Sequence, residues 1–363
     1  MKCLVQPDDG VTALIEAIDA AKKSVEILIF RFDRHDIEAA LGRAVVRGVK
    51  VHALTAYTNR GGEKTLRALE LRLLDAGATV DRTAGDLLRY HGKMMIIDRR
   101  QLHVLAFNYT QIDIQRSRSF GVITTNRKLV QEAIRLFEAD CARQPYTAGN
   151  PGFLVSPINA RKELSAFIRG AKKELLIYDP EVSDKGMIEL LQARAKAGVE
   201  IRIFGKVGAK GVKLNARPLP RIRLHARTIV RDRSQVFLGS QSLRALELDS
   251  RREVGVMVRD RSAVDRIAKT FDEDWAMKAD LPAEAEDSRI GEPAVVPANK
   301  VAKRVAKAVV ENMQPIAPEV VAELGPHVPE VEAAVKTAVK DAVKEVVRDF
   351  VENAMEHLEA EVN

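Results

Sequence analysis

The chain has 363 residues, 46% of them hydrophobic and 30% charged, which is enough for two core-forming units and a tail. Its two cysteines, Cys3 and Cys141, are too few for a disulfide framework and have no metal-ligand spacing, so a reducing compartment is expected. The chain has no apolar run of about 18 residues, and its N-terminal segment turns acidic early. We therefore expect a cytoplasmic protein without a signal peptide or a spanning helix, in which any membrane contact is peripheral.

Charge is unevenly distributed along the chain. Residues 281–363 contain 9 Lys+Arg and 16 Asp+Glu, and subtracting these from the totals of 58 and 51 leaves 49 and 35 for residues 1–280. The body is therefore strongly basic and the tail acidic. A basic body suits an anionic substrate such as a phospholipid headgroup or a nucleic acid, and charge alone does not separate the two.

Each half of the body opens with the same order of segments: an apolar run, a helix-length stretch ending at Gly and a second apolar run. They cover residues 25–30, 37–48 and 49–54 in the first half, and 175–178, 188–198 and 199–204 in the second. This order predicts a β-α-β unit in each half. Helices rich in Ala, Lys and Glu are expected to precede these units, starting near Val11 and Ala160.

A histidine motif follows each unit. His91-x-Lys93-x4-Asp98 recurs as His225-x-Arg227-x4-Asp232, and residues 137–141 match 271–275 at the same separation along the chain. Constant register indicates an internal duplication. The first half has about 16 extra residues before its motif, for which we predict a helix over residues 63–77.

A Pro- and Gly-containing segment, residues 142–152, joins the halves. We predict lobes at residues 1–144 and 153–280, followed by a linker and helical tail at 281–363. Valines four residues apart in the tail predict amphipathic helices, which favours packing or self-association. The acidic balance and small apolar residues disfavour a membrane-surface helix.

The paired motifs, in register and each after a β-α-β unit, resemble the phospholipase D superfamily over roughly residues 10–280. Its members include phospholipases D, cardiolipin and phosphatidylserine synthases and some nucleases. The resemblance implies an α/β fold with two pseudo-twofold-related lobes, each a mixed β-sheet flanked by helices. The C-terminal helical tail lies outside it.

Two further segments carry the resemblance. In the family a Gly-Ser-x-Asn group follows the Asp: the second half keeps Gly239-Ser240 with Ser242 in place of Asn, and the first keeps only Asn108. Residues 249–256 resemble the family's carboxylate segment and contain Glu253. The matching position in the first half is Ser119.

These residue types suit the cleavage of a phosphodiester. Lys93 and Arg227 can hold its non-bridging oxygens and stabilise the charge that builds up during transfer. Asn108, Ser240 and Ser242 can add neutral hydrogen bonds. One imidazole attacks phosphorus and becomes phosphorylated, while the other protonates the leaving oxygen and then activates water or an alcohol. The sequence shows no cluster of metal ligands, so neither a metal nor another cofactor is expected.

The resemblance also implies the roles of the two histidines. Glu253 would orient His91 from the opposite lobe, which makes His91 the nucleophile and His225 the general acid and base. His225 is expected to lack a carboxylate partner, because Ser119 occupies that position, and so to have a lowered pKa. We expect Asp98 and Asp232 to anchor the motif structurally. The other histidines are interpreted as ordinary surface or strand residues: His35, His52, His103, His327 and His357.

The leading hypothesis is a phospholipase D-type phosphodiesterase or phosphatidyltransferase that cleaves or exchanges a phospholipid headgroup through a phosphohistidine. The alternatives are a metal-independent nuclease of the same superfamily and a catalytically inactive scaffold that binds phosphate groups. A lipid enzyme should have an apolar rim near the site, and the candidates for it are Leu87, Leu88, Tyr90, Leu219 and Ile222.

Overall fold

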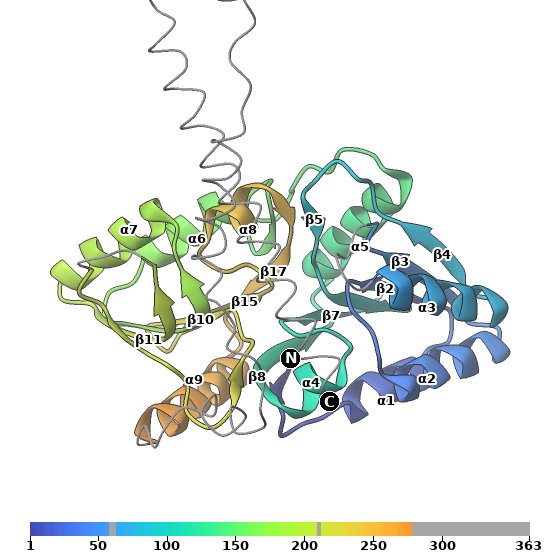
Figure 1. Cartoon of the computed structure of the whole chain (residues 1–363), viewed down its shortest axis with the longest axis horizontal. Coiled ribbons are helices and arrows are strands. Elements are labelled where there is room, and N and C mark those ends of the chain that lie inside the picture. The colour runs from blue at the N-terminus through green and yellow to red at the C-terminus, as the bar shows by residue number, and fades with distance from the viewer. Residues whose placement is uncertain (58–62, 209–211, 278–363) are drawn as a thin grey trace, which may run out of the picture. The chain divides into compact units, whose positions relative to one another are not determined.

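The computed structural model describes residues 1–57, 63–208 and 212–277. They form two α/β lobes, each a mixed sheet flanked by helices, as the resemblance implied (Figure 1). The predicted tail at 281–363 lies outside the described residues. Among the described helices, none is long and apolar enough to cross a bilayer.

The first lobe is built on a sheet with the strand order β1-β8-β7-β6-β2-β3-β4. Strands β2, β3 and β4 pair in parallel, and the remaining neighbours along this order pair antiparallel. Its elements are β1 (Lys2–Gln6), α1 (Thr12–Ala20), β2 (Ser24–Ile29), α2 (His35–Val46), β3 (Lys50–Thr55), α3 (Glu63–Asp75), β4 (Thr79–Arg82), β5 (Arg89–Tyr90), β6 (Met94–Ile97), β7 (Gln101–Leu105), α4 (Gln111–Gln115), β8 (Ser117–Thr124) and α5 (Arg127–Ala142).

The second lobe repeats this topology with the strand order β12-β11-β10-β14-β15-β17-β9. Here β10, β11 and β12 are the parallel strands. Its elements are β9 (Phe153–Val155), α6 (Ala160–Arg169), β10 (Glu174–Val182), α7 (Lys185–Lys196), β11 (Glu200–Val207), β12 (Asn215–Arg217), β13 (Arg223–Leu224), β14 (Thr228–Arg231), β15 (Gln235–Gly239), α8 (Ala245–Asp249), β16 (Arg251–Arg252), β17 (Val254–Val258) and α9 (Arg261–Ala276).

Both predicted β-α-β units are confirmed, as β2-α2-β3 and β10-α7-β11. The helices predicted before them are α1 and α6, and the extra helix of the first half is α3. The central strands have continuous runs of apolar residues instead of alternating apolar and polar ones, because helices or the other lobe cover both of their faces.

One hydrophobic core is shared by the two lobes. It contains residues of both sheets together with the buried faces of α5 and α9. The N-termini of these two helices are capped by the side chains of Asn126 and Asp260, which accept hydrogen bonds from backbone N–H groups of the first turn. Helices α1, α2 and α3 pack in a separate core of the first lobe, and α6, α7 and α8 in one of the second. The shared core fixes the two histidine motifs relative to each other.

Candidate active site

Two short parallel strand pairs join the lobes just before the histidines. Strand β5 pairs with β16, and β13 pairs with β8. The two pairs are equivalent in the duplication, because they are offset along the chain by the same number of residues as the two histidine motifs. The next residue in each case is the motif histidine. The backbone N–H of His91 donates to Arg252 O over 2.7 Å, and that of His225 donates to Arg118 O over 3.1 Å. Each imidazole is therefore held by its own backbone against the opposite lobe.

The ring of His91 is enclosed by three side chains. Its Nδ1 lies 2.9 Å and 3.1 Å from the two carboxylate oxygens of Glu253, which is fully buried and belongs to the other lobe. Lys93 Nζ lies 2.8 Å from Nε2 of the same ring. The ring of Phe30 packs edge-on against it, with centroids 4.5 Å apart. The structure thus brings His91, Lys93 and Glu253 together.

Burial sets the protonation of this group. It lowers the pKa of His91 well below the usual value, and the positive charges of Lys93 and Arg227 lower it further. Burial also lowers the pKa of Lys93 to about 7. Burial, with the nearby charge of Glu247, raises the pKa of Glu253 to about 7. At neutral pH the His91 imidazole is uncharged. Donating its Nδ1–H to Glu253 leaves the Nε2 lone pair available for attack.

The environment of His225 corrects one expectation. Its Nε2 lies 3.0 Å from Oδ2 of Asp113, a buried residue of α4 in the opposite lobe, so a carboxylate does lie beside His225, although Nε2 is not aligned for a hydrogen bond to it. Ser119 lies in β8 as the register required, but its buried Oγ has no hydrogen-bond partner among the described residues. The carboxylate beside His225 thus belongs to α4, the helix that precedes β8, and not to β8 itself. One sequence signal could have identified Asp113. Asp113 and Glu247 are the same number of residues apart as His91 and His225, so both halves have an acidic residue at this position of the duplication.

The lowered pKa expected for His225 is present, but its cause is different. Burial lowers the pKa to about 4, and Arg223 contributes, while Asp113 opposes the shift. Burial alone would raise the pKa of Asp113. Interactions with the His225 ring and with the Arg223 guanidinium, together with a hydrogen bond from the Asn108 backbone, nevertheless hold it well below the usual value. The Arg223 guanidinium donates to Asp113 over 2.7 Å. His225 is therefore an uncharged imidazole beside a carboxylate in the free protein.

Glu247 holds the position in α8 that corresponds to Asp113, but its partners are arginines. Arg227 Nε lies 3.9 Å from one Glu247 oxygen, and Arg251 donates to the other over 3.5 Å. Arg227 also donates to the backbone oxygen of His225 over 3.1 Å. The positive charge of Arg227 affects the pKa values of His91, Lys93 and His225, which places it among both imidazoles.

The predicted neutral binding residues hold other parts of the site in the free protein. Asn108 donates from both its backbone N and Nδ2 to Asp113, over 2.8 Å and 2.7 Å. Ser242 donates from its backbone N to Glu247 over 2.6 Å. Ser240 Oγ accepts from the backbone N–H of Val254 over 3.0 Å, next to Glu253. These residues position the carboxylates of the site, and their contact with a substrate stays a prediction.

The motif aspartates contact backbone on each lobe. Asp98 accepts hydrogen bonds from the N–H groups of residues 22–24, and Asp232 from those of residues 172–174. Of the other histidines, His35 is exposed and His103 is buried in β7, while His327 and His357 lie outside the described residues.

Two lobes that present paired histidines, cations and carboxylates to each other define a phospholipase D-type fold and site. The family model described as "Cardiolipin synthase, PLD-like domain" matches residues 14–141 and 164–275, and the chain belongs to this family.

Relatives within this class carry different names. The chain is 26% identical over 294 residues to a polyphosphate kinase 1 of Chlorobaculum tepidum, covering 72% of this chain and 42% of that protein. It is 27% identical over 134 residues to a phospholipase D of Rickettsia felis, covering 37% of this chain and 64% of that one. The crystal structure of a polyphosphate kinase from Porphyromonas gingivalis superposes with a TM-score of 0.63 at 19% identity, over 78% of this chain and 54% of that chain, which shows the shared fold. The chain spans less than half the length of the polyphosphate kinase sequences it matches.

Proposed function

We propose that this protein is a phosphoryl-transfer enzyme that forms a phosphohistidine at His91 and uses His225 as general acid and base. The observation that carries the proposal is the surroundings of His91: a neutral, buried imidazole with Nδ1 against Glu253 and Lys93 Nζ beside Nε2. A carboxylate behind one ring nitrogen selects the tautomer that leaves the other nitrogen nucleophilic.

The reaction proceeds in two balanced steps. In the first, His91 Nε2 forms a bond to phosphorus while the bond to the leaving oxygen breaks, and that oxygen takes a proton from His225. In the second, an acceptor oxygen attacks the same phosphorus, His225 takes its proton, and His91 departs unchanged. Lys93 and Arg227 stabilise the non-bridging oxygens in both steps.

His225 must gain a proton before it can act as an acid. Its pKa of about 4 leaves it neutral in the free protein. An anionic substrate supplies the missing effect, because negative charge beside an imidazole raises its pKa. Substrate binding therefore charges the acid that the first step requires.

The charges around His91 favour a polyanionic substrate. Lys93, Arg227, Arg89 and Arg251 all lie close enough to lower its pKa. A condensed phosphate chain can neutralise several cations at once, whereas a phospholipid offers one phosphodiester. The similarity to polyphosphate kinases over about 70% of this chain supports the same class. We therefore propose inorganic polyphosphate, cleaved at a phosphoanhydride, as the leading substrate.

The second candidate is the phospholipid headgroup inferred from the sequence. The description of the matching family and the phospholipase D relatives favour it. The apolar rim proposed for such an enzyme is mostly absent from the described surface: Tyr90 and Leu219 are buried, and Leu87 and Ile222 pack against the cores. Leu88 alone of the five is exposed. Nucleic acid and the inactive phosphate-binding scaffold are the remaining alternatives.

One experiment separates these substrates. The full chain is incubated with ³²P-labelled polyphosphate, labelled phosphatidylglycerol vesicles or labelled single-stranded DNA, beside His91→Ala and the control His35→Ala, which removes an exposed imidazole. We expect acid-labile, base-stable label on the protein from polyphosphate, retained in the control and lost in His91→Ala. Turnover of the lipid or DNA alone would transfer the assignment to that substrate. Absence of His91-dependent label or turnover with all three would favour the scaffold.

A further inference from the structure

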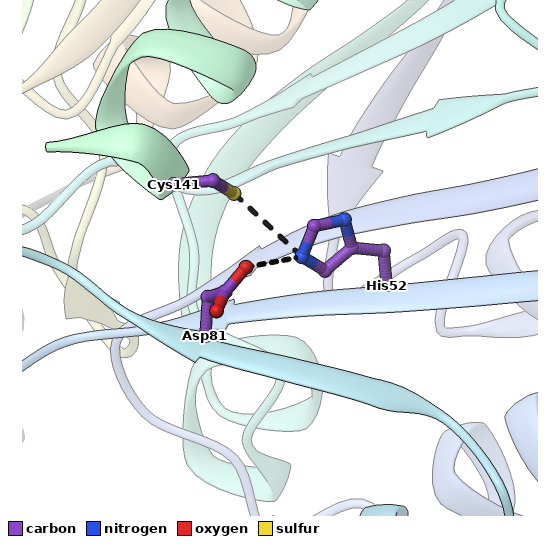
Figure 2. Close-up of side chains that lie close together, drawn as sticks. All are labelled: His52, Asp81 and Cys141. Atoms are coloured by element: carbon purple, nitrogen blue, oxygen red, sulfur yellow. Dashed lines mark hydrogen bonds and ion pairs between the residues drawn. The ribbon is translucent and has the colours of Figure 1, made fainter. Parts of the chain in front are cut away.

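Three side chains capable of binding a metal converge on the first lobe, apart from the histidine motifs (Figure 2). His52 comes from β3, Asp81 from β4 and Cys141 from the last turn of α5. His52 Nε2 lies 2.8 Å from Asp81 Oδ2 and 3.8 Å from Cys141 Sγ, and the three ligand atoms all lie within 4.8 Å of one another. The sequence alone indicates no such cluster. The three residues are far apart in the sequence, and only the fold brings them together.

We propose that His52, Asp81 and Cys141 bind a Zn²⁺ ion through the imidazole Nε2, a carboxylate oxygen and the thiolate sulfur, with water as the fourth ligand. This site goes beyond the proposed phosphoryl transfer and does not depend on it. Imidazole nitrogen, thiolate sulfur and carboxylate oxygen are the ligands Zn²⁺ uses in proteins.

The two contacts of His52 compete for one atom. A ring nitrogen offers either one hydrogen or one lone pair, in a single direction in the ring plane. Nε2 cannot make a well-aligned hydrogen bond to both the Asp81 carboxylate and the Cys141 sulfur. An ion among the three atoms takes a lone pair from each, and so satisfies all three groups at once.

The distances are close to those of a tetrahedral site. Zn–N and Zn–O bonds of about 2.0–2.1 Å and a Zn–S bond of about 2.3 Å place N and O about 3.3 Å apart and N and S about 3.6 Å apart. The observed separations are 2.8 Å and 3.8 Å. These two pairs therefore differ from the ideal values by roughly 0.5 Å or less. The third pair, the Asp81 oxygen and the Cys141 sulfur, lies within 4.8 Å.

Regular secondary structure holds the ligands in place. Strands β3 and β4 are parallel neighbours in the sheet, with Leu54 opposite Asp81. The Phe137 ring packs edge-on against His52, with centroids 5.1 Å apart, and fixes the imidazole plane. The His52 and Asp81 side chains are 30% and 44% exposed, so an ion can enter and water can reach the fourth position.

The second lobe has different chemistry at the same three places. Arg202 corresponds to His52, because each is the third residue of its strand. Arg217 corresponds to Asp81, because each pairs with the fifth residue of the neighbouring strand, β11 or β3. Trp275 takes the place of Cys141 in the duplicated register. There the Arg217 guanidinium stacks 4.0 Å from the centroid of the Trp275 ring. The fold is thus maintained there without ligand groups, so the first lobe's His-Asp-Cys set is not required by the architecture.

The test uses cobalt as a spectroscopic substitute for zinc. The full chain is stripped with a chelator and titrated with Co²⁺, then with Zn²⁺. We expect a sulfur-to-cobalt charge-transfer band in the near ultraviolet at one equivalent, displaced by Zn²⁺. Cys3→Ser, the matched control that keeps Cys141, retains the band, and Cys141→Ser loses it. Asp81→Asn weakens zinc binding by more than the roughly 10–100-fold typical of outer-shell changes.

The thiolate band distinguishes this site from other metal contacts. Histidines elsewhere in the chain give no sulfur charge-transfer signal. Absence of the band in the wild type, or its persistence in Cys141→Ser, would overturn the proposal. Should Cys141→Ser misfold by circular dichroism, undiminished zinc affinity in Asp81→Asn would also refute it. Labelling of His91, measured on the same preparations, reports separately on the phosphoryl-transfer proposal.

Discussion

The two lobes have the same backbone around their histidines and different side chains. In each, a two-residue strand pairs with the opposite lobe and delivers the imidazole to it. His91 receives its carboxylate from Glu253, which follows the paired strand β16. His225 instead lies beside Asp113 of the preceding helix, because Ser119 of β8 takes the position that corresponds to Glu253. Duplication thus preserves the geometry that places the imidazoles, while the carboxylate partner can come from another element. We infer that the lobes differ in catalytic role.

The largest expected difference between the lobes concerns the covalent step. His91→Ala removes the nucleophile and abolishes protein labelling. His225→Ala removes only proton transfer, which slows turnover by about 10²–10⁴-fold and still allows phosphohistidine to form. Quantifying base-stable label in both variants during a single turnover measures this. Label retained in His91→Ala and lost in His225→Ala would reverse the assigned roles.

Loss of the carboxylate beside His91 should reduce activity more than loss of the carboxylate beside His225. Glu253→Gln lets the amide donate to His91 Nδ1 and so favours the wrong tautomer, with a loss in kcat of up to about 10⁴-fold, as in other carboxylate–imidazole pairs. Asp113→Asn leaves His225 neutral, as it already is in the free protein, and destabilises its protonated form; it also weakens the contacts of this position with Arg223 and Asn108. We expect a loss no greater than the lower end, about 10²-fold, of what a general acid and base contributes. Steady-state kinetics on both variants provide the comparison, and an equal or larger loss in Asp113→Asn would show that His225 has the more demanding role.

The sequence predicted the scaffold and the first half of the site. Helical and strand periodicity, together with the constant register of the duplication, located both β-α-β units, and the resemblance implied the Glu253–His91 contact. Asp113 was missed because the family pattern places the carboxylate at the position of Glu253, where the first half has Ser119, and a residue of the preceding helix reaches His225 only in three dimensions. The His52 cluster was missed for a similar reason: parallel strand pairing and helix packing bring its members together, and neither leaves a local spacing to recognise.

The pH profile should reflect the His91 side of the site. As pH falls through about 7, Glu253 becomes protonated and donates to Nδ1, which moves the ring proton to Nε2 and removes the nucleophile. As pH rises through about 7, Lys93 loses the charge that holds the substrate. We expect kcat/KM to be bell-shaped and centred near neutrality. The acid limb should disappear in Glu253→Gln, and Lys93→Arg should move the alkaline limb to higher pH. A profile unaffected by either change would assign the titration to other groups.

The smallest differences are expected where the lobes are most alike. Asp98 and Asp232 each accept three backbone hydrogen bonds at positive φ. These hydrogen bonds lower the pKa of both carboxyls against the opposing effect of burial. Their stabilisation is therefore fully present above the unfolded pKa of about 3.9 and is lost as pH falls through the folded value.

At neutral pH, Asp98→Asn and Asp232→Asn preserve the side-chain oxygen and tolerate the left-handed backbone, but they remove the charge. Each should lower the free energy of unfolding by about 1 kcal/mol, discounted for partial exposure. Urea denaturation measures both. Because one core joins the lobes, we expect a single transition and equal shifts in the two variants. Two separate transitions, each sensitive to only one aspartate, would show that the lobes unfold independently despite that core.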